Sequence, residues 1–181
     1  MVKKQMTKAC NFYVSQWHLF AALLPYIRDE LKNNNQIIFI SQDNLEKGLN
    51  QLVSKLNLKF ENKNGINDVI WLDENFKLDI KVEKRPIDII VQGTVNFIKD
   101  INSYIDNNFK KIYREITVIN CYEIYDTNEM LYNILDEHDY VFNTAGMNEK
   151  SAIFHGYINK NETFGDKYNE LQQKNSYENC F

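Results

Sequence analysis

The sequence predicts a single α/β domain with a mainly parallel β-sheet flanked by helices. Two observations predict this fold class. Short apolar runs alternate along the chain with segments in which apolar residues recur every three or four positions, which is the order of strands and helices in βαβ units. Some of these runs are apolar at every position, as expected of strands that are covered on both faces. Strands joined by helices in this order pair in parallel through right-handed crossovers.

The first βαβ unit is expected over residues 11–44. Residues 11–15 form a short β-prone run, and residues 17–32 carry one apolar stripe at helical spacing. Pro25 lies inside this helix and removes a backbone donor, so we expect a bend or irregular first turns. Three asparagines end the helix, and the continuous apolar run within residues 36–41 predicts a buried strand.

The middle of the chain predicts a helix and two short strands. Asp43 or Asn44 can cap a helix that ends near Asn57. Strands are expected at residues 69–72 and 76–82, and together they can form a hairpin. The second of them alternates apolar and polar residues, which leaves one face in water. We therefore expect a short antiparallel piece at an edge of the main sheet.

The remaining elements repeat the same pattern. Strands are predicted at residues 87–91, 116–122 and 140–143, with helices over 97–109 and around 130–135. From Asn148 onward the sequence is polar, and we interpret it as a partly helical tail. The predicted organisation is an arm at residues 1–10, one domain at 11–147 and the tail at 148–181.

Composition excludes several classes of function. The chain has 181 residues, 44% of them apolar, which suffices for one core. A net charge of −4, with lysines scattered among acids, argues against autonomous nucleic-acid binding. The apolar run from Leu19 to Ile27 is too short to span a bilayer, and the N-terminal residues lack the apolar region of a signal peptide. We expect a cytoplasmic protein.

Cysteine and histidine spacing predicts neither a disulfide framework nor a metal site. Cys10, Cys121 and Cys180 are far apart in the sequence, so free thiols are expected, with a bridge from Cys10 to Cys180 as the less favoured alternative. A zinc site of His18, Cys121 and His138 lacks the local ligand spacing of known sites. We expect no metal and no cofactor.

The order of motifs resembles a known sensory domain. The segments that carry the resemblance are His18-Leu19-Phe20, residues 34–41, residues 119–126 and the stretch from Asp136-Glu137-His138 to Gly146. Over residues 11–146 they resemble the MEDS domain, which is named for methanogens, methylotrophs and the dichloromethane regulator and is related to RecA/KaiC-type ATPases. The resemblance implies a RecA-like sheet that has lost its phosphate-binding loop and serves in signal transduction and transcription regulation. It also implies a small organic ligand.

This chain departs from the usual setting of that domain because it carries no recognisable DNA-binding helix pair and no kinase domain. If it regulates a process, it acts through another protein or as a free-standing module. The loop Ser15-Gln16-Trp17-His18 contains neither the glycines nor the lysine of a phosphate-binding loop.

Candidate site residues are those that leave the predicted strands, because ligands of open α/β sheets bind outside the carboxyl ends of the strands. The aromatic residues among them, together with Tyr13, would form the walls of a crevice, and the polar residues would orient a ligand inside it. In the alternative interpretation Trp17 fills the former nucleotide space as a core residue and His18 only bonds neighbouring backbone. The predicted ligand-binding residues are Gln16, Trp17, His18, Gln92, Asn120, Tyr122 and Tyr125.

The sequence therefore predicts a non-catalytic sensory module that binds a small organic ligand or a signalling protein at the carboxyl edge of the sheet. It leaves a homo-oligomer open. One alternative is a divergent nucleotide hydrolase, although neither Asp43 nor Asp88 has a matching lysine loop. Another is an interaction adaptor whose edge strand at residues 76–82 pairs with a partner. Cys121, inside an apolar strand, is interpreted as a small buried hydrophobe.

Overall fold

The computed structural model describes residues 6–60, 65–72, 85–109, 115–127 and 130–154. In these residues seven strands form one sheet with the order β3-β2-β4-β5-β1-β6-β7. The strands are β1 (Met6–Tyr13), β2 (Gln36–Ser41), β3 (Ile70–Leu72), β4 (Ile87–Gln92), β5 (Ile116–Glu123), β6 (Tyr140–Asn143) and β7 (Gly146–Asn148). The helices are α1 (Gln16–Lys32), α2 (Leu45–Lys55), α3 (Val95–Phe109), α4 (Leu131–Glu137) and α5 (Lys150–Ile153), with 3-10 turns at Gly65–Asp68 (η1) and Ile124–Asp126 (η2).

The sheet is parallel except at one edge, which confirms the predicted fold class. Strand β1 pairs with β5 along its whole length, from Met6 opposite Ile116 to Tyr13 opposite Glu123. Strand β4 lies between β5 and β2, and β3 extends the sheet beyond β2 in parallel. Only β6 and β7 are antiparallel. The carboxyl ends of β1, β2, β4 and β5 therefore meet at one edge of the sheet, which we call the carboxyl edge.

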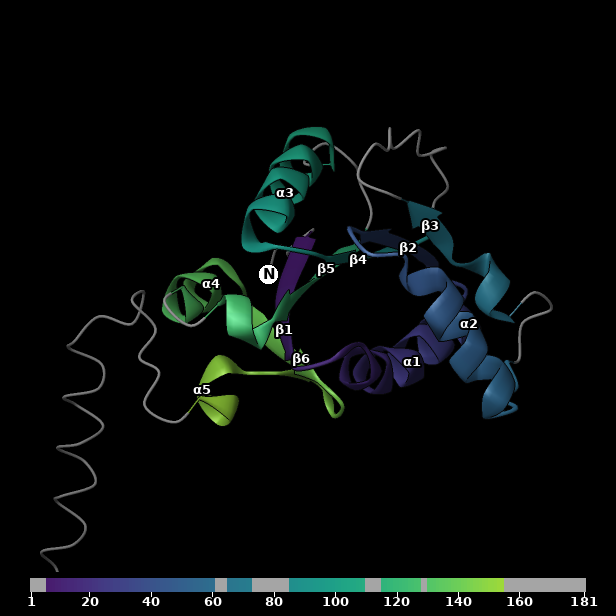
Figure 1. Cartoon of the computed structure of the whole chain (residues 1–181). Coiled ribbons are helices and arrows are strands. Elements are labelled where there is room, and N and C mark those ends of the chain that lie inside the picture. Colours follow the sequence, from purple (N-terminus) through teal and green to yellow (C-terminus); the bar gives the residue numbers. More distant parts are fainter. Residues whose placement is uncertain (1–5, 61–64, 73–84, 110–114, 128–129, 155–181) are drawn as a thin grey trace, which may run out of the picture.

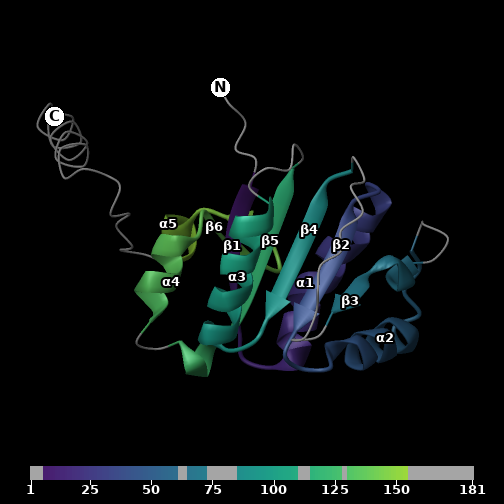
Figure 2. The same cartoon turned by 90° about the horizontal axis from the view of Figure 1, so that it is seen from above.

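Helices cover both faces of the sheet. Figures 1 and 2 show α1 and α2 on one face and α3 and α4 on the other. The α1 face is packed with residues such as Phe20, Ile27 and Phe39, and the α3 face with residues such as Ile89, Ile98 and Val118. Alternating positions along each strand supply the two layers, because successive side chains of a strand point to opposite faces.

Within the described residues the predicted helices and central strands are confirmed, and three details of the sheet differ. The predicted first strand begins at Asn11, but β1 already includes Met6 and ends at Tyr13. The strand at 69–72 exists as the edge strand β3 but pairs in parallel with β2. The predicted hairpin partner at residues 76–82 lies outside the described residues. The antiparallel piece of the described sheet is β6–β7, at the opposite edge, where Gly146 adopts a positive φ of 94°.

Candidate functional site

A buried hydrogen-bond network occupies the carboxyl edge. Gln92 ends β4 and is 3% exposed, and its Nε2 donates to the Tyr13 hydroxyl at 2.8 Å and to Asp43 Oδ2 at 2.9 Å. Its Oε1 accepts from the Ser41 hydroxyl at 2.7 Å. One amide thus links the ends of β1, β2 and β4. Because its amide oxygen and nitrogen both have protein partners, Gln92 locks this edge of the sheet.

The loop between β1 and α1 also uses its own polar groups. The Ser15 hydroxyl accepts from the His18 amide at 3.3 Å and thereby caps the helix. The His18 Nδ1 atom accepts from the Val14 amide at 3.4 Å. The predicted interpretation of His18 as a partner of neighbouring backbone is confirmed. Two amides near the place where a phosphate-binding loop would hold its anion are already bonded within the chain.

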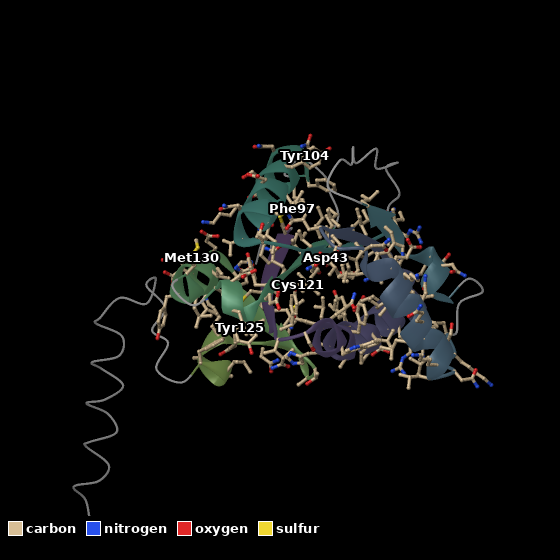
Figure 3. All side chains as sticks on the ribbon, viewed as in Figure 1. Asp43, Phe97, Tyr104, Cys121, Tyr125 and Met130 are labelled. Atoms are coloured by element: carbon tan, nitrogen blue, oxygen red, sulfur yellow. The ribbon has the colours of Figure 1, made fainter. Side chains whose placement is uncertain are left out.

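The structure does not bring the seven predicted residues into one crevice. Gln16, Trp17 and His18 are exposed at the start of α1, and Gln92 is enclosed in the network. Tyr125 is 71% exposed in η2, and Figure 3 shows it toward α4 and α5, apart from Asp43 and Cys121.

Asn120 and Tyr122 face away from Gln92. The β4–β5 register sets Gln92 opposite Cys121, so the two flanking residues of β5 point to the other face of the sheet. Both are buried, Tyr122 in the core layer beneath α3 and α4 and Asn120 beside His138. The tyrosine ring stacks on Phe12 with the ring centroids 6.0 Å apart. The predicted convergence of polar groups from β4 and β5 on one ligand is therefore wrong.

Trp17 is neither a core plug nor a wall of a crevice at the centre of the carboxyl edge. Its side chain is 54% exposed, so the interpretation of a buried plug is wrong. The indole meets Phe20 edge to face, with the ring centroids 6.0 Å apart. It lies at the flank of α1 that is turned toward α2.

At that flank lies an apolar cavity of about 380 Å³, which we call the α1–α2 cavity. From α1 it is lined by Trp17, Ala21, Leu24, Pro25 and Arg28, and from α2 and the chain after it by Leu52, Leu56, Leu58 and Phe60. Trp17, Ala21, Pro25 and Arg28 follow one another at spacings of four, four and three, so they form a second stripe beside the buried one that contains Leu24. That spacing was the signal that sequence reasoning missed.

A smaller cavity of about 320 Å³ lies beyond the carboxyl ends of β2 and β3. Its lining includes Asp43 and Glu46 as well as Trp71. The described lining residues include no lysine or arginine, although phosphoryl transfer requires a cationic group beside the carboxylates that hold the metal ion. Asp88, the other carboxylate considered for phosphoryl transfer, lies near the opposite end of β4, where it accepts from the Tyr26 hydroxyl at 2.8 Å. Burial raises the pKa of Asp88.

His138 and Asn120 form a buried pair on the α3 face. The histidine is 4% exposed and follows α4, with Nδ1 2.6 Å from the Ile134 carbonyl and Nε2 2.8 Å from Asn120 Nδ2. A proton on Nδ1 satisfies both contacts, because it is donated to the carbonyl while Nε2 accepts from the amide. Burial is the main cause that lowers the pKa of His138 to about 4, and the charges of Lys8 and Lys150 act in the same direction.

The described cysteines are buried free thiols. Cys10 and Cys121 are both fully buried, and burial raises the pKa of Cys10 to about 12. Cys121 behaves as the predicted small hydrophobe, and Cys180 lies outside the described residues. Cys121 faces α1 while His138 faces α3, so the considered zinc site is not assembled. Among the described residues no cluster of three or more candidate ligands surrounds a common point.

Comparison of the chain with family models, with curated proteins and with solved structures gave no match in any of the three. The resemblance to the MEDS domain therefore stays a prediction that rests on the residues quoted for it. Within the described part of the chain, no helix combines the length and the apolar character that crossing a membrane requires.

Proposed function

We propose that the protein is a regulatory module that acts by binding a small organic molecule in the α1–α2 cavity and not by catalysing a reaction. The cavity is the observation that carries this proposal. Its volume of about 380 Å³ falls within the range of small-molecule sites, and eight of its nine lining residues are apolar. The proposal keeps the sensory role expected from the sequence and moves the ligand from the centre of the carboxyl edge to the flank of α1.

Two features of the cavity wall favour a ligand with one polar end. Pro25 has no backbone N–H, so α1 cannot form the regular hydrogen bond to the carbonyl of Ala21, and both residues line the cavity. Arg28 adds a cationic group that is 50% exposed and lies 3.3 Å from Asp29 Oδ1. A hydroxyl group can donate to the carbonyl and accept from the guanidinium. The ligand class that fits is a small apolar alcohol or a related molecule.

The carboxyl edge supports a binding role over nucleotide chemistry. Phosphoryl transfer needs cationic groups and metal-holding carboxylates around the transferred group. Gln92 instead bonds to Tyr13, Ser41 and Asp43, and the described residues that line the neighbouring cavity include no lysine or arginine. A second candidate function, a protein-interaction adaptor, is favoured by the exposed rings of Tyr125 and Tyr132 near α4, which are 71% and 67% exposed.

Native mass spectrometry of freshly purified protein, followed by calorimetric titration with cyclohexanol and benzyl alcohol, tests the proposal. We expect a co-purified organic mass or saturable binding of the alcohols. Ala21→Phe should abolish either signal, because it fills the cavity from an exposed position without removing a wall. Asn107→Phe, at an exposed position of α3 on the other face, is the matched control. A bound nucleotide would instead support the enzyme, and an empty oligomer that binds neither alcohol would support the adaptor.

Trp17→Ala should weaken binding of the alcohols because it removes one wall of the cavity, whereas Tyr132→Ala, an exposed aromatic on the other face, should not. Since half of the indole is already exposed, the loss of stability should stay near 1–2 kcal/mol, below the 3–5 kcal/mol typical of a buried tryptophan. Equal effects of the two truncations on affinity would contradict the assignment.

A further inference from the structure

Helix α2 is held firmly against the protein in its first half and loosely in its second half. The first half contributes Leu45 and Leu49, which are 4% and 0% exposed. In the second half Leu52 and Val53 are only partly buried, and Leu56, which follows the last turn, is 57% exposed. Figures 1 and 2 show α2 at the outer side of the α1 face, next to β3. The second half of α2 therefore has few packed side chains that hold it in place.

The close contact between α1 and α2 lies at Gly48. A Cβ atom at this position would come within 3.0 Å of the Phe20 ring and 3.3 Å of Gln16 Nε2, so the absence of a side chain lets the two helices approach here. One and two turns later the α1–α2 cavity separates the helices, with Leu52 and Leu56 in its wall. The helices are thus in contact near the start of α2 and apart near its end. A pivot near Gly48 changes the width of the cavity without moving the buried first half of α2.

The last turn of α2 and the chain that follows it form one unit. Asn57 has a left-handed backbone conformation with a φ of 49°, and the Leu58 amide donates to the Val53 carbonyl at 3.1 Å. These are the features of a Schellman motif, which closes the C-terminus of a helix. The leucines that this unit contributes to the cavity wall therefore move together. We call residues 52–58 the α2 end.

The α1–α2 cavity is wider than the proposed ligand needs. Its volume is about 380 Å³, whereas an apolar cavity of about 150 Å³ is enough to bind benzene. A six-carbon alcohol therefore fills less than half of the space. Small-molecule sites bury about 70–90% of the surface of their ligand, so the walls must approach each other to enclose this one. Trp17 on one wall and Leu56 on the other are 54% and 57% exposed, and both apolar side chains gain from being covered.

We propose that the α2 end is a lid, which closes toward α1 when a small organic molecule occupies the α1–α2 cavity. The proposal rests on the function proposed above and adds how the ligand changes the protein. Closure of an empty cavity would leave a void, and the side chains around a void lose packing contacts. A ligand fills that void, so it binds the closed state more tightly than the open state and shifts the population toward closure. The outer face of α2 then moves with occupancy of the site, which is the change of shape that a regulatory module needs.

Accessibility to a soluble gadolinium chelate, measured by NMR on the full-length protein, tests the closure. The variant Trp71→Phe leaves Trp17 as the single indole, and isotope labelling reveals the methyl groups of Leu56 and Ile153. Without ligand the chelate should broaden all three signals, since these side chains are 54%, 57% and 38% exposed. With saturating cyclohexanol the broadening of the indole and Leu56 signals should fall by at least half, because one small ring covers both only if the walls approach. Ile153, on α5, is the control and should not change.

The same experiment separates failure of the lid from failure of the ligand site. If cyclohexanol shifts the Trp17 indole signal but leaves Leu56 as strongly broadened as before, the lid is overturned and the site stands. If the indole signal does not respond to cyclohexanol at all, the site itself fails and the lid fails with it.

A matched pair of variants tests the lid through affinity. Leu56→Gln keeps a side chain of similar length but places an amide where closure would bury methyl groups. Calorimetry should show the affinity for cyclohexanol weakened by about fivefold or more. Lys55→Gln, at the neighbouring exposed position outside the cavity lining, should leave the affinity unchanged. Both proteins are first compared by circular dichroism to establish that they are folded. Unchanged affinity in folded Leu56→Gln would refute the closure.

Discussion

His138 should make the protein lose stability as the pH falls from neutral. Its imidazole is buried between α4 and β5, and its Nε2 accepts from Asn120 only while that nitrogen carries no proton. The pKa is lowered from 6.5 to about 4. A group with a lowered pKa contributes stability that is fully present above its unfolded-state pKa and lost as the pH falls through the folded-state value. The loss of stability is therefore expected as the pH falls from 6.5 to about 4.

The size of the effect follows from the two pKa values. Each pKa unit is worth about 1.4 kcal/mol, so the fall of the pKa from 6.5 to about 4 corresponds to about 3 kcal/mol of unfolding free energy. Other groups also make the stability depend on pH, since burial raises the pKa values of Asp88 and Glu30. The contribution of His138 is isolated by comparing the unfolding free energy of the wild type with that of a variant that lacks this imidazole.

Urea unfolding of the wild type and of His138→Gln at a series of pH values measures that difference. Glutamine does not titrate, so the advantage of the wild type should be constant above pH 6.5 and shrink by about 3 kcal/mol toward pH 4. His18→Gln, at the exposed start of α1, is the matched control for loss of an imidazole. A difference between wild type and His138→Gln that does not change with pH would refute the buried neutral imidazole.

Three further substitutions test other parts of the structure. Gln92→Leu should cost about 2–4 kcal/mol in urea unfolding, because it removes the donor to the buried Tyr13 hydroxyl and to Asp43 Oδ2; a loss below 1 kcal/mol would contradict the network. Gly93→Ala should cost about 1–2 kcal/mol, because the new Cβ would lie 2.5 Å from the Phe97 ring; unchanged stability would mean that the ring moves freely. Asp88→Asn should gain stability relative to the wild type as the pH rises above 3.8. Burial raises the pKa of the wild-type carboxyl, so its ionisation destabilises the folded wild type but has no counterpart in the variant. The opposite pH dependence in unfolding experiments would refute the raised pKa of Asp88.

The sequence predicted the central layers well because their signals are local. The run Ile37–Ile40 is apolar at every position, and β2 is buried on both faces. The helical repeat from Val95 to Phe109 likewise predicts α3 and its buried face. Such patterns report burial directly, so they need no knowledge of which elements become neighbours.

The edges of the sheet were less predictable because pairing is not encoded locally. The apolar stretch before Leu72 fits a hairpin strand as well as a parallel edge strand, and its position beside β2 decides the outcome. At the other edge, the chain from Asn143 to Gly146 forms a tight turn in which Asn143 Oδ1 accepts from the Ala145 amide at 2.8 Å. The asparagine and the glycine of this turn were signals for the antiparallel pair.

The register of the strands explains why the predicted site residues do not point into one crevice. Residues at the carboxyl ends of neighbouring strands share an edge, but each side chain points to one face of the sheet, and a shift by one residue reverses that face. Gln92 and Tyr13 face α1, whereas Asn120 and Tyr122 face α3. The apolar spacing along α1 was visible in the sequence, but the α1–α2 cavity also depends on how α1 and α2 pack on each other, which periodicity within one helix does not determine.

The central claim, an apolar ligand site between α1 and α2, is tested most directly at the indole of Trp17. The chain has two tryptophans, and Trp71→Phe leaves Trp17 as the single one while keeping a ring to stack on Phe39, 4.7 Å away. In the ¹H–¹⁵N spectrum of this variant, cyclohexanol should shift the Trp17 indole signal saturably, and adding Ala21→Phe should abolish the shift. An indole signal that stays in place, or that shifts equally in the blocked variant, would contradict the account.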